Sequence, residues 1–176
     1  MYLLRHALSP GISGFGVKAA KETKPLILCL GSADRGDDAQ GACCADLLSQ
    51  RGIPAKLMAG NAFELMDHFR THRHIIIVDA IVSGSREPGY IHRFYGAPDE
   101  VAGFAPSCST HGFGLGEALR LGAVLKALPE RLTIFGIESS VFEWGAAPSP
   151  AVAASMEALV EAVVAEWEGR APAGAS

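Results

Sequence analysis

Three side chains with metal-binding chemistry come from separate parts of the chain. Asp38 lies in "GSADRGDDAQG", Asp79 follows the apolar run "HIIIV", and His111 lies in "SCSTHGFGLGEAL". Two carboxylates and one imidazole, with positions left for water or substrate, suit a divalent transition metal such as Zn²⁺ or Ni²⁺. The donor set does not select between these metals. It forms a site only if the fold brings the three residues together.

The elements that carry these residues alternate between strands and helices. Short apolar runs predict strands, and apolar residues spaced three and four apart predict helices. The predicted strands cover residues 26–30, 55–59, 74–78, 89–95 and 132–137. The predicted helices cover residues 38–50, 62–70, 112–128 and 152–167, with a loop over residues 96–110. Phe63, Met66 and Phe69 are expected on one face of the second helix, and Val124 on the apolar face of the third.

This order of elements predicts a three-layer α/β/α sandwich with a mostly parallel, roughly five-stranded twisted sheet. Interior strands without a polar face must be covered on both sides. Binding sites in such folds lie at the carboxyl ends of the strands. Asp38 follows the loop after the first strand, Asp79 ends the third strand, and His111 begins the next helix. All three are therefore expected at the same rim of the sheet.

Each of these residues also has an explanation that involves no metal. Asp37 and Asp38 could cap free N–H groups at the start of a helix, an effect of about 0.5–2 kcal/mol. Asp79 could cap the turn that begins at Ala80. His111 could bond to a backbone carbonyl at its helix entry. The residue spacing leaves these alternatives open.

Two further candidates are weaker. His72 and His74 alternate in "THRH", but further ligands are not apparent nearby, so a solvated strand entry is expected. Cys108 lies three residues before His111, but "PSCST" lacks any sign of the helix N-terminus that activates a thiol. The remaining cysteines are expected to pack as small hydrophobic side chains.

Composition limits the class of protein. The chain has 176 residues, of which 49% are hydrophobic, enough for one buried core. Its net charge is -4 and no segment carries a block of Lys or Arg, which makes nucleic acid and anionic membrane poor candidate partners, so neither nucleic-acid binding nor membrane insertion is expected. The apolar residues near the N-terminus are interrupted by charges, proline and glycine, so neither a signal peptide nor membrane insertion is expected.

The domain organisation follows from the same features. We expect an N-terminal extension over residues 1–24, a single α/β domain over residues 25–168, and a flexible tail over residues 169–176. The four cysteines include no C-x-x-C pair, which is typical of reduced, cytoplasmic proteins.

Several motifs resemble those of the [NiFe]-hydrogenase maturation proteases. "LGSADRGDDAQG" is similar to the first-loop signature of that family, a glycine-asparagine turn followed by R-G-D-D or R-G-D-E and a further glycine. "IIIVDAI" resembles the second signature, and "STHGFGL" resembles the segment that carries the family's histidine. "FGIESS" and "PSPAV" resemble the last strand and the start of the final helix. The resemblance extends from about Leu26 to Trp167.

This resemblance implies a metal-dependent endopeptidase that removes the C-terminal extension of an immature [NiFe]-hydrogenase large subunit. By matching motif, the metal-binding and catalytic residues are Asp38, Asp79 and His111. The resemblance also implies that the metal is nickel already inserted in the substrate, and that Zn²⁺ or Cd²⁺ would substitute for it in vitro. Asp37 is then expected to cap its helix, or to hold Asp38 in position without binding the metal itself.

The chain also departs from the family pattern. Ser32 occupies the position of the loop asparagine, and Cys29 that of an earlier glycine. "LMAGNAFEL" stands where the family often has an aspartate-glycine-glycine-threonine turn. These departures leave open a non-catalytic chaperone that binds nickel or the precursor during hydrogenase assembly. A nucleotide-binding α/β protein using the Gly31 loop is opposed by Asp37 and Asp38, because a phosphate there would face two negative charges.

Overall fold

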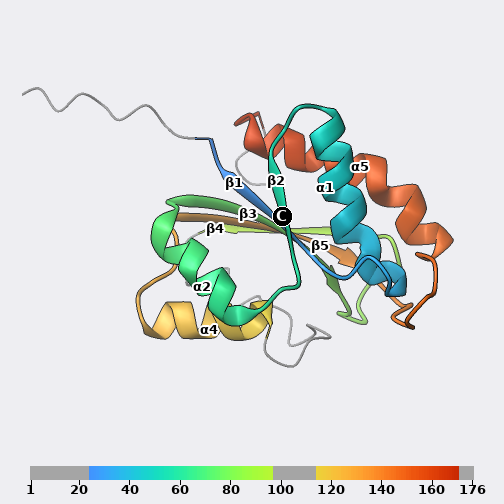
Figure 1. Ribbon diagram of the computed structural model, residues 1–176, viewed down its shortest axis with the longest axis horizontal. Coiled ribbons are helices and arrows are strands. Elements are labelled where there is room, and N and C mark those ends of the chain that lie inside the picture. The colour runs from blue at the N-terminus through green and yellow to red at the C-terminus, as the bar shows by residue number, and fades with distance from the viewer. Residues whose placement is uncertain (1–23, 97–113, 171–176) are drawn as a thin grey trace, which may run out of the picture.

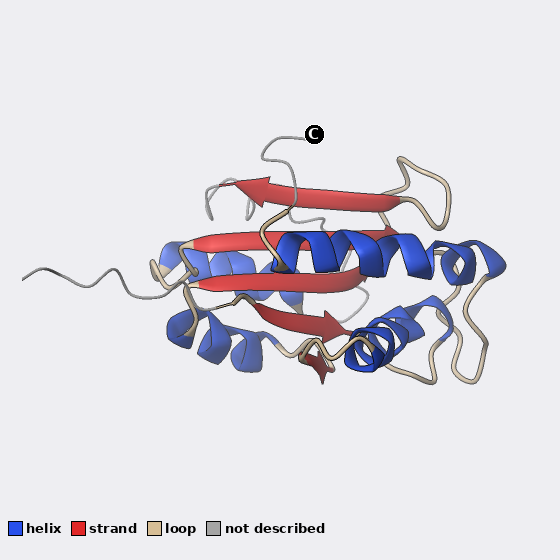
Figure 2. Cartoon of the chain, turned by 90° about the horizontal axis from the view of Figure 1, so that it is seen from above, coloured by secondary structure: helices blue, strands red, loops and turns tan. Residues whose placement is uncertain are grey.

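A five-stranded sheet forms the centre of the molecule (Figure 1). The computed structural model describes residues 24–96 and 114–170. The strands, in the order β2-β1-β3-β5-β4 across the sheet, are β2 (Ala55–Met58), β1 (Leu26–Leu30), β3 (His74–Ile81), β5 (Arg131–Glu138) and β4 (Ile91–Gly96). All neighbours are parallel except β4, which runs antiparallel to β5 at one edge (Figure 2). The predicted mostly parallel sheet with an edge strand is confirmed.

Helices cover both faces of the sheet, as predicted for a three-layer sandwich (Figure 1). The helices are η1, a short 3₁₀ helix (Gly36–Ala39), α1 (Gln40–Gln50), α2 (Ala62–Thr71), α4 (Leu115–Val124) and α5 (Pro150–Trp167). α1 and α5 pack together on one face, and α2 and α4 pack together on the other. The loops that follow β1, β2, β3 and β5 therefore meet at one rim.

Alternate residues of the interior strands enter two separate cores. In β3, Ile76 and Val78 pack beneath α1 and α5, whereas Ile75 and Ile77 pack beneath α2 and α4. All four side chains are fully buried. A strand covered on both faces needs apolar residues at every position, which explains the unbroken run "HIIIV".

Strand β3 is longer than the sequence pattern indicates. The prediction that Asp79 ends this strand is wrong, because β3 continues to Ile81 and pairs with β5 along its whole length. Asp79 lies beside Gly136, and Ile81 lies beside Glu138. A carboxylate thus stands inside the sheet, two residues before the strand ends.

Two predicted apolar faces also differ from the structure. Phe63 is 66% exposed, because α2 turns Leu65, Met66 and Phe69 toward the sheet instead. Val124 is exposed as well, and α4 ends there rather than at residue 128. The amide N–H of Ala127 donates to the carbonyl of Gly122, which closes the end of the helix.

Parts of the prediction fall outside the described residues. These are most of the predicted extension, most of the predicted loop, the first residues of the helix predicted from residue 112, and most of the predicted tail. Along the two described ranges, none of the helices combines the length and the apolar character that a bilayer crossing requires.

Candidate active site

The first candidate ligand, Asp38, is held in the 3₁₀ turn η1 at the start of α1. Its side chain is 1% exposed, and its Oδ2 accepts a hydrogen bond of 2.9 Å from the backbone N–H of Ser32. Gly31 makes this fold of the loop possible. Its φ is +137°, and a Cβ atom there would lie 2.1 Å from the carbonyl oxygen of Asp38. This close approach of two backbone segments requires glycine at position 31.

A Gly31→Ala substitution should destabilise the protein and displace Asp38. Strain and the forced movement of backbone together are expected to cost about 1–3 kcal/mol. Gly52→Ala is the matched control, because Gly52 also has a positive φ, +71°, but no atom lies within 4 Å of its added Cβ. Chemical denaturation of both variants measures the difference. Equal losses of stability would contradict the role of the Gly31–Asp38 contact.

Asp79 is the second candidate ligand, and its carboxylate is buried near that of Asp38. The side chain is 8% exposed, and its pKa is raised from 3.8 to about 7. Burial is the main cause, and repulsion by the negative charge of Asp38 is the second. A hydrogen bond from the backbone of Ala80 partly opposes both. Two buried carboxylates that repel each other form a place where a cation would be stabilised.

Replacing Asp79 with Asn should stabilise the protein at alkaline pH. The pKa of Asp79 is about 7 in the folded state against 3.8 ordinarily, so between these values the folded state binds more protons than the unfolded chain. Stability therefore falls as pH rises through this range and stays low above it. The shift corresponds to on the order of 4 kcal/mol at most. Since Asn resembles the protonated acid at every pH, Asp79→Asn should melt at a higher temperature than wild type at about pH 8.

Thermal unfolding at about pH 4 and about pH 8 checks this expectation. The advantage of Asp79→Asn should vanish in acid, where wild-type Asp79 is itself protonated. Asp46→Asn, which changes an exposed acid on α1, is the control and should show no such pH-dependent gain. A variant at position 79 that is less stable than wild type in alkali would contradict a repelling carboxylate pair.

Asp37 has a different role from its neighbour. Its side chain is fully buried, and it accepts hydrogen bonds from the backbone N–H groups of Ser140 (2.9 Å), Val141 (3.0 Å) and Ser149 (2.6 Å). Burial alone would raise the pKa of Asp37, but these hydrogen bonds lower it below its ordinary value. The carboxylate caps neither η1 nor α1. The expected capping role is therefore wrong, and Asp37 instead ties the loop after β5 to the Asp38 turn.

The third predicted ligand, His111, lies outside the described residues. In residues 24–96 and 114–170 there is no group of three His, Cys, Asp or Glu side chains that could hold a metal. The structure thus brings together Asp38 and Asp79 of the predicted set. The assignment of His111 stays a prediction.

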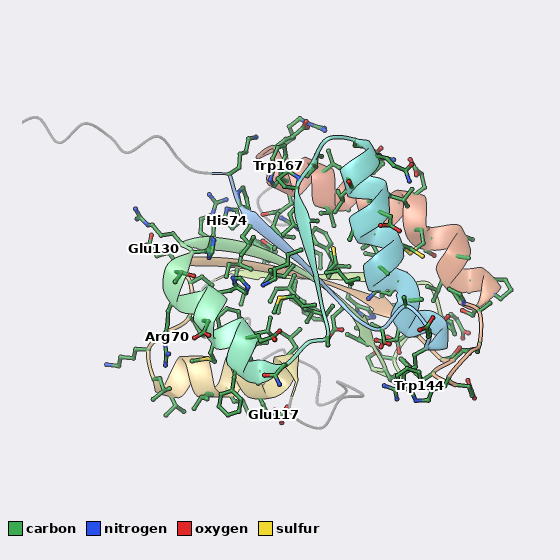
Figure 3. The ribbon with its side chains drawn as sticks, viewed as in Figure 1. Arg70, His74, Glu117, Glu130, Trp144 and Trp167 are labelled. Carbon is green, nitrogen blue, oxygen red and sulfur yellow. The ribbon has the colours of Figure 1, made fainter. Side chains whose placement is uncertain are left out.

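The weaker histidine candidates do not share a site. His72 lies at the end of α2 beside His68, with ring centroids 5.6 Å apart. His74 is turned inward, and its Nε2 lies 3.8 Å from a carboxylate oxygen of Glu166. Figure 3 places His74 near Trp167, toward the end of the sheet where β3 begins. A solvated strand entry describes His72 but not His74.

The cysteines behave largely as expected. Cys29 and Cys44 are free and fully buried, and the pKa of the Cys29 thiol is raised by a hydrogen bond with Cys44 and by burial. Cys43 is also free but exposed, so only two of the described cysteines pack as small hydrophobic groups. Cys108 lies outside the described residues.

A polar cluster beyond Asp79 was missed by sequence reasoning. Glu138 is 3% exposed and accepts hydrogen bonds from the backbone of Ser83 (2.8 Å) and Gly84 (3.0 Å). Its other oxygen lies 2.7 Å from the Ser83 hydroxyl and 3.0 Å from Nε2 of His92. Burial would raise the pKa of Glu138, but these hydrogen bonds lower it. The cluster fixes the loop after β3, and its members come from separate elements with no local motif.

Comparisons with known proteins agree on one family. Residues 57–166 match the hydrogenase maturation protease family. The hydrogenase 2 maturation protease of Escherichia coli (strain K12) is 32% identical to this chain over 146 residues. The aligned region covers 80% of this chain and 88% of that protein.

Solved structures of the same kind share the fold. The [NiFe] hydrogenase maturation protease HybD from Thermococcus kodakarensis is 26% identical, with 82% of this chain and 99% of that chain covered and a TM-score of 0.68. The hydrogenase maturating endopeptidase HybD from E. coli is 25% identical, with coverage of 84% and 93% and a TM-score of 0.68. The chain therefore belongs to the hydrogenase maturation protease family.

Proposed function

We propose that this protease removes the C-terminal extension of a [NiFe]-hydrogenase large-subunit precursor after nickel has been inserted. Membership of the family supports the protease activity. The observation that carries the metal dependence is the buried pair Asp38 and Asp79, in which burial first, and then repulsion between the two carboxylates, raise the pKa of Asp79 to about 7. Such a pair is suited to a cation that arrives from outside.

In this proposal the nickel belongs to the substrate. Asp38 and Asp79 bind it together with His111, and the metal polarises the scissile peptide for attack by water. Zn²⁺ or Cd²⁺ could replace nickel in vitro, since carboxylate and imidazole ligands accept these ions too. Asp79 must lose its proton to bind a metal, so binding should weaken as pH falls below about 7.

One experiment tests this proposal and also distinguishes a protease from an assembly chaperone. The purified precursor, with and without nickel, is incubated with the wild-type protein and its mass is measured. Loss of the C-terminal extension from the nickel-loaded precursor alone is expected. A chaperone would bind the precursor and leave its mass unchanged, and equal cleavage of both forms would remove the role of nickel.

The proposed setting is the cytoplasm, where thiols stay reduced. The free cysteines Cys29, Cys43 and Cys44 suit such a compartment. The nucleotide-binding alternative has less support, because a phosphate at the start of α1 would meet Asp37 and Asp38. Both aspartate side chains are buried there, and close contact between like charges is unfavourable.

A further inference from the structure

A large aromatic side chain stands exposed at the rim where the ligands lie. Trp144, in the loop between β5 and α5, is 74% exposed. Figure 3 shows it at the opposite end of the molecule from Trp167, which belongs to the C-terminal end of α5. Exposed tryptophan side chains are costly to hydrate and are enriched at the centres of protein interfaces.

The loop that carries Trp144 is fixed to the loop that carries Asp38. The backbone N–H of Gly145 donates to the carbonyl of Asp34 at 2.7 Å, and that of Gly36 donates to the carbonyl of Ala146 at 3.1 Å. The three hydrogen bonds to the Asp37 carboxylate hold both ends of the same loop. Trp144 is thus held in a fixed position relative to Asp38, and little backbone freedom would be lost when it binds a partner.

A cation supports the indole ring from the Asp38 loop. The Arg35 guanidinium lies 5.8 Å from the centroid of the Trp144 ring and 5.9 Å from that of Phe142. Its Nε donates to the carbonyl of Phe142 at 3.1 Å. These contacts restrict the side chain of Trp144 while leaving most of its surface in water.

Because the candidate ligands are buried, the substrate must contact the surface that surrounds them. Asp38 and Asp79 are 1% and 8% exposed. A metal that is held by another protein can reach such buried carboxylates only if that protein presses against the surrounding rim. The loop that holds Trp144 is part of this rim, because Asp37 joins it directly to the Asp38 turn.

We infer that Trp144 is a principal docking contact for the precursor, with its ring seated in an apolar recess of that protein. This inference rests on the proposed function and adds the contact that determines affinity. Arg35 is a positioning residue that holds the ring. Val124 is even more exposed, at 79%, but it lies at the end of α4 that leads toward the start of β5, away from the rim.

The test compares Trp144→Ala and Trp144→Phe with wild type and with the control Val124→Ala. The dissociation constant for the nickel-loaded precursor is measured by titration, and KM and kcat are measured by cleavage. Trp144→Ala should raise the dissociation constant and KM by about 10- to 100-fold, with kcat and melting temperature nearly unchanged. Trp144→Phe should fall between wild type and Ala, and Val124→Ala should match wild type.

The outcomes distinguish this inference from the proposed function. If wild type cleaves the precursor and Trp144→Ala does so with unchanged KM and dissociation constant, the docking role is overturned. If wild type leaves the nickel-loaded precursor intact, the proposed function fails, and the titration alone then decides the docking role. A fall in kcat without a change in affinity would also overturn it, because a docking contact acts on binding.

Discussion

Asp38→Asn should abolish cleavage of the nickel-loaded precursor while the protein stays folded. The amide oxygen can still accept the hydrogen bond from Ser32, so the turn should keep its shape. In the proposed mechanism the substitution removes one of the negative charges that would bind the metal, and with it several kcal/mol of charge stabilisation. Cleavage should therefore fall below detection, which corresponds to a decrease in rate of about 100-fold or more. Removal of the repulsion with Asp79 should leave the melting temperature equal or higher. Mass spectrometry of the precursor over time measures the rate.

Asp34→Asn is the matched control for this variant. Asp34 is an exposed acid in the same loop. Its hydrogen bond with Gly145 is accepted by the backbone carbonyl, so a change of the side chain leaves it in place. Its replacement should leave cleavage near the wild-type rate. Cleavage by Asp38→Asn at the control's rate would show that this carboxylate is not a ligand.

Asp37→Asn should produce the largest loss of stability among the site variants. The carboxylate accepts three backbone hydrogen bonds, from Ser140 and Val141 at one oxygen and from Ser149 at the other. An amide can replace only one of these oxygens, and its NH₂ group would face a backbone donor. Loss of a charge-assisted hydrogen bond in a buried site is expected to cost about 2–4 kcal/mol. Denaturant unfolding at neutral pH measures this loss.

The pH dependence of the Asp37 effect has a defined sign. The pKa of Asp37 is lowered in the folded state, so its contribution to stability is present above the ordinary value of 3.8. This contribution is lost as pH falls through the folded pKa. The difference between wild type and Asp37→Asn should therefore shrink in strong acid. Cleavage by Asp37→Asn should be reduced but measurable, in contrast to Asp38→Asn, and a stable variant without activity would reverse the two roles.

The sheet could be predicted because its strands carry their own signal. Leu26–Leu30 is apolar at every position, and the structure places that strand at the same bounds. The error at Asp79 has the same origin, because a charged residue normally ends such a run. The partners of β3 in β5 decide its length, and they lie far along the chain. Phe63 was misplaced because the helical period shows that a helix has an apolar face but not how far around the helix the buried face extends.

The candidate site, like the fold, could be predicted from the sequence only in part. Asp38 and Asp79 could be chosen because strand ends of a parallel sheet converge, and the resemblance to the maturation proteases is confirmed by the comparisons. The role of Asp37 could not be predicted, because its partners Ser140 and Ser149 lie 103 and 112 positions away. The cluster around Glu138 has the same character. His111 still depends on the motif alone.

In the proposed function, this protease binds nickel that is held by its substrate. Nickel X-ray absorption of the loaded precursor, alone and after mixing with protease and freezing before cleavage, tests it most directly. We predict that wild-type protein adds oxygen and nitrogen ligands to the nickel, and that Asp38→Asn and Asp79→Asn each reduce this change. A nickel spectrum that stays the same when the wild-type protein binds the precursor would contradict the account.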